Sequence, residues 1–109
     1  MGENDKNIVL ELKNSVPEDI TKHIKRCIVY GSRVRGEGSE ESDLDILMLV
    51  DEKRTDIEQK LEDVAYQIMW NHNFSPIISL KVFAEHKFNQ ALKEGFSFYR
   101  NVEQEGIIV

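Results

Sequence analysis

The sequence predicts an α/β protein, or α+β in the stricter naming, in which a small mixed β-sheet is flanked by helices. Three apolar runs predict the strands, at residues 27–30, 43–50 and 77–83. Between the second and third runs, apolar residues recur at spacings of four, three and four, which is the period of a helix with one buried face. A helix between two strands is the unit that builds a sheet covered by helices.

The three runs predict strands with different surroundings. Residues 46–50 are all apolar and do not alternate with polar ones, which is typical of a strand buried on both faces. Residues 27–30 form a shorter β-branched and aromatic run. Residues 77–83 alternate more, so we expect this strand to be half exposed or to lie near the edge of the candidate site, with one apolar face made by Ile78, Leu80 and Val82.

Two helices are predicted before the first strand. Residues 4–14 carry apolar side chains at helical spacing. Ser15 lies three residues before Glu18, with a proline in between, which predicts the start of a second helix. Ile20 and Ile24 would form its apolar face.

Two further helices are predicted around the third strand. Thr55 and Glu58 form a capping-box pattern that opens a helix reaching about Trp70. Residues 85–94 predict a short helix that ends just before a glycine. The large side chains in and beyond these segments are predicted to be packing groups rather than a base-stacking platform: Tyr66, Met69, Trp70, Phe74, Phe96, Phe98 and Tyr99.

Length and composition favour one globular domain spanning residues 1–109. Cys27 is the only cysteine, so we expect a buried structural thiol and no disulfide framework. The formal charge of −6 and a pI near 5.0 disfavour bulk binding to nucleic acid. The sequence predicts neither a signal peptide nor a membrane span, so we expect a cytoplasmic protein.

The segment from Tyr30 to Val50 carries the chemistry. It contains Gly31-Ser32, ten intervening residues, and then Asp43-Leu44-Asp45. Residues two apart on a strand point to the same face, so the two aspartates would present a pair of carboxylates suited to Mg²⁺. A strand that ends in a Gly-Ser turn would place backbone N–H groups and the Ser32 hydroxyl where they could cradle phosphate.

Two arginines follow the turn. Arg33 and Arg35 bring forked donors that match phosphate geometry. Anion donors therefore lie at one end of the segment and metal-binding carboxylates at the other. A nucleoside triphosphate with its Mg²⁺ requires both.

This arrangement resembles the minimal nucleotidyltransferases of the DNA polymerase beta superfamily. The likeness includes the spacer, which contains Arg33, Arg35, Gly36 and Gly38 and ends with Ser42. It implies a polymerase beta-like palm fold and transfer of a nucleoside monophosphate, AMP from ATP in the first instance, to a hydroxyl acceptor with release of pyrophosphate. It further implies a nucleotide site at Gly31, Ser32, Arg33, Arg35 and Ser42, and catalytic Mg²⁺ ligands at Asp43 and Asp45.

The resemblance also extends to the third strand and the C-terminal segment. In this family a third carboxylate often comes from the third strand, whereas this chain has none there before Glu85, and Ser79 or Lys81 takes that face. A short aromatic helix, a Glu-Gly pair and a last apolar strand would close the chain, as residues 96–109 do.

The resemblance implies partners as well. Similar proteins pair with a small helical HEPN protein as antitoxin and toxin, the nucleotidyltransferase adenylylating the toxin. The chain is short, so an acceptor surface is expected to come from such a partner or from a homo-oligomer. Two alternatives stay open: a weakened relative that only binds nucleotide or masks a toxin, and transfer to a small hydroxyl compound such as an antibiotic.

Overall fold

The computed structural model describes residues 1–36 and 41–109. Gly38 and the glutamates at positions 37 and 40, which belong to the predicted spacer loop, lie outside the described residues. In the described chain, four strands form one mixed sheet in the order β3-β2-β1-β4. Their bounds are β1 Ile24–Tyr30, β2 Leu44–Val50, β3 Ile78–Ala84 and β4 Ile107–Ile108.

The pairing directions make the sheet mixed, as the sequence predicts. β2 runs parallel to β3 and antiparallel to β1, and β4 runs antiparallel to β1. A parallel pair needs a crossover connection, and helix α4 (Thr55–Asn71) provides it between β2 and β3. The predicted mixed sheet with flanking helices is therefore confirmed.

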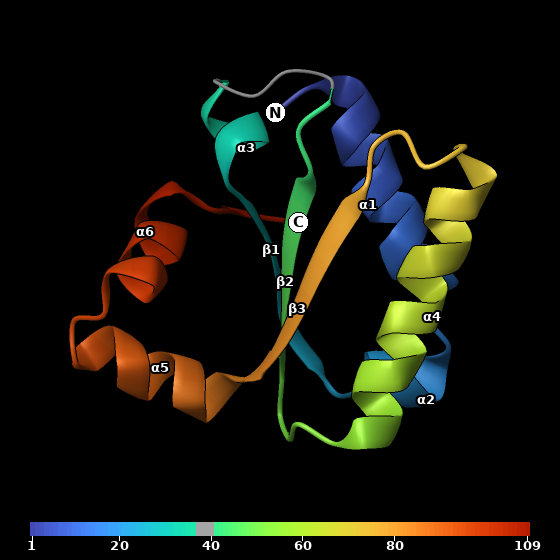
Figure 1. Cartoon of the computed structure of the whole chain (residues 1–109). Helices are drawn as coiled ribbons and strands as arrows, with labels where there is room; N and C mark the ends of the chain where they lie inside the picture. Colours follow the sequence, from blue (N-terminus) through green and yellow to red (C-terminus); the bar gives the residue numbers. More distant parts are fainter. Residues whose placement is uncertain (37–40) are drawn as a thin grey trace.

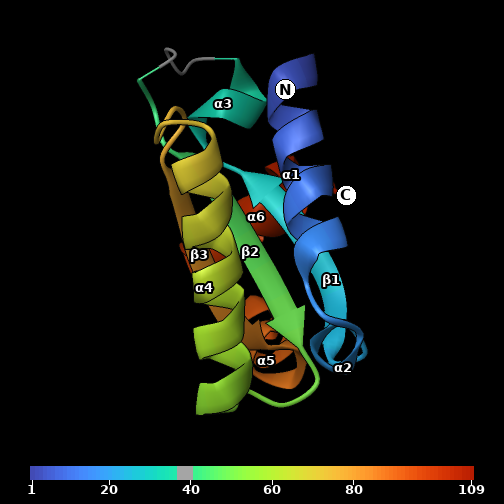
Figure 2. The same cartoon turned by 90° about the vertical axis from the view of Figure 1, so that its right-hand side faces the viewer.

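Helices cover both faces of the sheet (Figure 1). Helix α1 (Glu3–Ser15) and α4 lie side by side over one face (Figure 2), and they share a core with the sheet. Helices α5 (Glu85–Lys93) and α6 (Ser97–Glu105) cover the other face. Two short helices, α2 (Glu18–Thr21) and α3 (Ser32–Arg35), flank β1.

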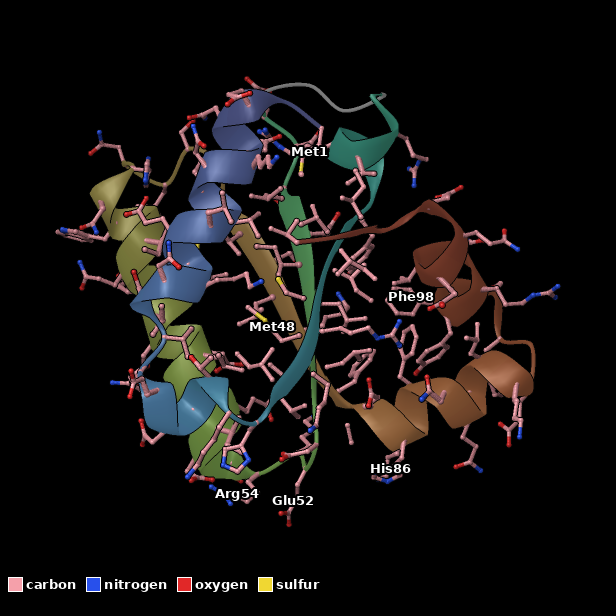
Figure 3. All side chains as sticks on the ribbon, turned by 180° about the vertical axis from the view of Figure 1, so that it is seen from behind. Met1, Met48, Glu52, Arg54, His86 and Phe98 are labelled. Carbon is pink, nitrogen blue, oxygen red and sulfur yellow. The ribbon has the colours of Figure 1, made fainter. Side chains whose placement is uncertain are left out.

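Burial follows the predicted patterns in β2 and α4. Every residue of β2 except Asp45 is buried, as expected for a central strand covered on both faces. In Figure 3, Met48 points to the side of α1 and α4, while Phe98 lies between α6 and the sheet. The sheet has a larger core on the side of α1 and α4 and a smaller core on the side of α5 and α6. The predicted stripe of α4 faces the larger core with Ile57, Leu61, Val64 and Ile68.

β3 is an edge strand of the sheet with one buried and one more exposed face. Ile78 and Val82 are buried in the larger core, whereas Lys81 is exposed. The prediction of a half-exposed strand is therefore confirmed. Cys27 is buried as predicted, and burial raises the pKa of its thiol to about 11.

The helix start predicted at Ser15 is wrong. Helix α1 continues to Ser15, whose hydroxyl donates to the Glu11 carbonyl oxygen at 2.8 Å instead of capping a second helix. The following helix has only four residues, because Ile24 already pairs with Val50 as the first residue of β1. Strand pairing thus overrides the local helical pattern.

The capping box expected at Thr55 is also absent. Helix α4 begins at Thr55 itself after Arg54, and no side chain caps it. The carboxylate of Glu58 instead lies 3.8 Å from the Lys53 ammonium.

The packing role predicted for the large side chains is confirmed for Met69, Phe98 and Tyr99, whereas Phe96 is exposed. Phe98 and Tyr99 pack against the smaller core. Tyr66, Trp70 and Phe74 form an exposed aromatic group, because Tyr66 and Trp70 lie on the side of α4 opposite its buried stripe. Among the described residues, no helix has the length and hydropathy needed to cross a membrane.

Candidate active site

The Gly-Ser turn lies where β1 ends and α3 begins. Gly31 has φ +86° and ψ −166°, a conformation that residues with a Cβ rarely adopt. A Cβ at this position would also collide with an oxygen of the Asp45 carboxylate. Glycine is therefore required twice, by the backbone conformation and by the close approach to the aspartate.

Strand pairing brings the two halves of the motif together. Tyr30, the residue before Gly31, pairs directly with Asp45 across β1 and β2. Asp43 lies one residue before β2 and is exposed, whereas Asp45 is half-buried. The end of β1 and the start of β2 therefore lie at the same end of the sheet, as Figure 1 shows.

The electrostatic setting of Asp45 favours a cation. Burial raises the pKa of Asp45, Asp43 adds to this rise, and Lys81 and Arg35 oppose it. A desolvated carboxylate beside a second carboxylate is unfavourable when both are ionised. A bound cation would relieve this cost, as would a proton.

The chemistry of the two carboxylates fits Mg²⁺. No group of three or more metal-binding side chains occurs within residues 1–36 and 41–109. Mg²⁺ is usually held by one or two carboxylates together with substrate phosphates and water, so Asp43 and Asp45 meet its protein requirement. Both residues come from the start of β2, the most buried strand.

Arg33 makes contacts that fix the site. Its Nη1 donates to the Asp5 carboxylate at 2.8 Å, and its Nε donates to the Ser42 carbonyl oxygen at 2.8 Å. One guanidinium thus connects α3 to α1 and to the segment that leads into Asp43. The resemblance predicts phosphate binding for Arg33 and Ser42, and these contacts give both residues a role in positioning the turn and the carboxylates.

Arg35 points to the other side of the turn. Its Nη1 lies 3.3 Å from a carboxylate oxygen of Glu105 on α6. Arg35 also lowers the pKa of Asp45, so its charge acts on the carboxylate site. The described structure therefore brings Gly31, Arg35 and Asp45 together, with Glu105 as a neighbour that sequence analysis did not select.

The third strand places no carboxylate beside Asp45. Ser79 is the register partner of Asp45 on β3, and Lys81 follows on the same face of the strand. Tyr30 flanks Asp45 on the other side, and burial raises its pKa to about 12, with Asp45 adding to the rise. The central carboxylate therefore lies between a neutral phenol and a neutral hydroxyl.

A match to a protein-family model shows the family to which the chain belongs. A family model described as "Polymerase beta, Nucleotidyltransferase" matches residues 11–107. The chain belongs to this nucleotidyltransferase family. The matched range contains the whole sheet except the last residue of β4, together with every site residue selected from the sequence.

Two relatives of the family come from Methanocaldococcus jannaschii. One is 31% identical over 106 residues, which make up 97% of this chain and 98% of the relative. The other is 38% identical over 77 residues, which make up 68% of this chain and 78% of that protein. Both carry the name "putative protein adenylyltransferase". No solved structure is significantly similar to this nucleotidyltransferase.

Proposed function

We propose that this nucleotidyltransferase transfers AMP from Mg²⁺·ATP to a hydroxyl group of a protein. The observation that carries the proposal is the packing of Gly31 against the Asp45 carboxylate, which brings the proposed phosphate-binding turn next to the proposed cation site. Family membership supports nucleotide chemistry, and the names of the two relatives support adenylyl transfer to a protein.

In this proposal each part of the site has one task. The N–H groups at the Gly31-Ser32 turn and the Ser32 hydroxyl bind the β- and γ-phosphates. Asp43 and Asp45 would hold Mg²⁺, which when bound supplies positive charge to the phosphate oxygens. Arg33 keeps the turn and the start of β2 in register through Asp5 and Ser42.

The reaction itself is a displacement at the α-phosphorus. The acceptor oxygen forms a bond to this phosphorus while the bond to the β-phosphate bridge breaks. Pyrophosphate leaves, and the acceptor proton passes to water. The side chains of this site contribute mainly by orienting and neutralising the triphosphate.

The acceptor proposed first is a helical HEPN toxin, as the resemblance of the motif implies. Similarity to proteins named for protein adenylylation is compatible with such a partner. Nucleotide transfer and toxin neutralisation would then be one event.

The test is label transfer from ATP labelled at the α-phosphate, in the presence of Mg²⁺. Acceptors are the protein encoded beside this one and a lysate of the source cells. Asp43→Asn and Asp45→Asn should each remove transfer, whereas Asp19→Asn, an exposed aspartate of α2, should retain it. Full Mg²⁺-dependent transfer by both site variants would overturn the proposal.

A second candidate follows from Ser79, which occupies the position beside Asp45 without offering a carboxylate. The protein would then bind nucleotide, or mask a toxin, without transfer. Calorimetry separates the two: binding of Mg²⁺·ATP with no label moved to any acceptor favours the binding module. In that case Asp43→Asn should leave toxin neutralisation intact.

A further inference from the structure

A pocket of about 210 Å³ lies beside the candidate site, between the end of β1, α3 and α6. Its walls include Tyr30, Gly31, Arg35, Phe98, Asn101 and Glu105. In the view of Figure 3, Phe98 lies on this side of the sheet. The proposed phosphate and metal roles leave Phe98 and Asn101 unused.

The pocket is continuous with the proposed triphosphate site. Gly31 belongs to both, because it lines the pocket and begins the turn that would hold the phosphates. The pocket is smaller than the roughly 300–1,000 Å³ of sites that enclose a whole drug-sized ligand. Its size therefore suits one ring system of a nucleotide whose phosphates lie outside.

The lining has the chemistry of a base-binding site. Tyr30 and Phe98 pack edge to face with ring centroids 5.7 Å apart, which gives the pocket an aromatic wall. Asn101 is exposed on α6 and offers an amide donor and an amide acceptor in one side chain. Glu105 offers acceptors only, when it is ionised.

These groups match one base better than the others. On its N7 edge adenine presents an amine donor next to a ring nitrogen acceptor, and an asparagine amide pairs with both at once. On the same edge guanine and hypoxanthine present two acceptors, the carbonyl oxygen and N7. The amide of Asn101 can donate to only one of them, and its own oxygen then faces the other.

We infer that this pocket receives the adenine ring of the nucleotide and that Asn101 reads its amine edge. The inference rests on the proposed function, since it assumes that the triphosphate binds at Gly31-Ser32. It makes Asn101 a specificity-determining residue. It also leaves the β3 side of Asp45, where Ser79 lies, as the open approach for an acceptor.

The experiment measures binding of the α,β-methylene analogues of ATP, GTP and ITP by calorimetry with Mg²⁺. The unchanged protein should prefer the ATP analogue by at least about fivefold, because that is the lower end of what one two-point base contact is worth. Asn101→Ala should bind all three analogues with similar affinity. Alanine is a better helix former than asparagine, so the exposed substitution should leave α6 folded.

Asn89→Ala is the matched control, since Asn89 is an exposed asparagine on α5 outside the pocket. It should keep the preference for the ATP analogue. Equal binding of the three analogues by the unchanged protein would overturn the inference. So would a preference that survives in Asn101→Ala. Failure of the unchanged protein to bind any analogue would instead overturn the proposed nucleotide function.

Discussion

Gly31 occupies a position that tolerates no side chain, and its replacement is a test of the site at atomic scale. Gly31→Ala must place a residue with a Cβ at φ +86° and against the Asp45 carboxylate. A positive φ combined with ψ −166° is essentially confined to glycine and costs about 1–3 kcal/mol, and overpacking costs about 1–3 kcal/mol. We expect a loss of about 2–4 kcal/mol in the free energy of unfolding, measured by urea denaturation, together with loss of nucleotidyl transfer.

Gly36 provides the control for this substitution. It has φ +77°, but among the described residues no atom beyond its chain neighbours lies within 4 Å of the position that a Cβ would take. Gly36→Ala should therefore cost only the conformational part, about 1–2 kcal/mol. An equal loss in both variants would mean that the contact between Gly31 and Asp45 adds nothing.

We predict that the ionised Asp45 carboxylate lowers the free energy of unfolding at neutral pH. Its pKa in the folded protein is raised, so the fold favours the neutral form. The stability associated with this group is fully present below the ordinary pKa of 3.8 and is lost as pH rises through the raised value. Asp45→Asn, which stays neutral, should therefore be more stable than the unchanged protein at pH 7, and this difference should vanish below the ordinary pKa.

Urea denaturation at pH 7 and at a pH below 3.8, without divalent cations, measures the difference in free energy of unfolding between Asp45→Asn and the unchanged protein. Asp19→Asn is the reference, because this exposed aspartate lies on α2. A variant of Asp45 that is less stable than the unchanged protein at pH 7 would contradict the argument from burial.

At the scale of elements, Arg33 and Asp5 hold α3 against α1. Their side chains are only 12% and 9% exposed, and the pair is 2.8 Å apart. Removing one partner of a buried pair typically costs about 3–5 kcal/mol, because the other charge is left desolvated. Asp5→Ala should approach that loss in urea denaturation and should weaken nucleotide binding, since the turn loses its support.

An exposed pair is the comparison for this prediction. Arg54 and Asp56 lie 2.9 Å apart with side chains 42% and 65% exposed. Asp56→Ala should lose far less stability than Asp5→Ala, because water screens such exposed pairs. If Asp5→Ala and Asp56→Ala lose the same stability, the buried pair does not hold the two helices together.

The contact between Arg33 and Asp5 also marks where sequence analysis stops. The motif predicts which residues meet at the turn, because Gly31 directly follows β1 and Asp45 lies on the neighbouring antiparallel strand β2. Asp5 is 28 positions away from Arg33 and looks like an ordinary helical acid until α1 packs on the sheet. Asn101 and Glu105 on α6 escape prediction for the same reason.

The predicted ends of helices and strands are wrong where local sequence preference and long-range strand pairing compete. Helix α4 and strand β2 are predicted well, because their apolar periodicity and their tertiary burial agree. The segment after Ser15 is predicted as a longer helix, but pairing of Ile24 with Val50 converts its end into strand. Pattern reasoning on one sequence does not include that partner.

At the scale of the whole molecule, the net charge and the strand order together decide how a nucleotide can bind. The chain carries a formal charge of −6, which opposes binding of a free polyanion. Strand order β3-β2-β1-β4 puts Asp45 on an inner strand, between Tyr30 and Ser79, and Asp43 just before that strand begins. Nucleotide binding should therefore depend on the cation more than on the net charge.

Because nucleotide binding should depend on the cation, Mg²⁺ and nucleotide together should stabilise the folded protein. A ligand that binds only the folded protein stabilises it by about 2.7 kcal/mol at one hundred times its Kd. For a domain of this size each kcal/mol moves the midpoint of thermal unfolding by about 4–8 °C. Saturating Mg²⁺ and α,β-methylene-ATP together should thus raise the midpoint by at least about 10 °C.

Removal of the metal separates the carboxylate site from simple anion binding. With EDTA in place of Mg²⁺, the nucleotide analogue should give little of that rise, because Asp43 and Asp45 then repel the triphosphate. Asp45→Asn should lose the Mg²⁺-dependent part although it starts from a more stable fold. A full thermal shift in EDTA would mean that the arginines and the Gly31-Ser32 turn bind the nucleotide by themselves, and the two aspartates would then need another role.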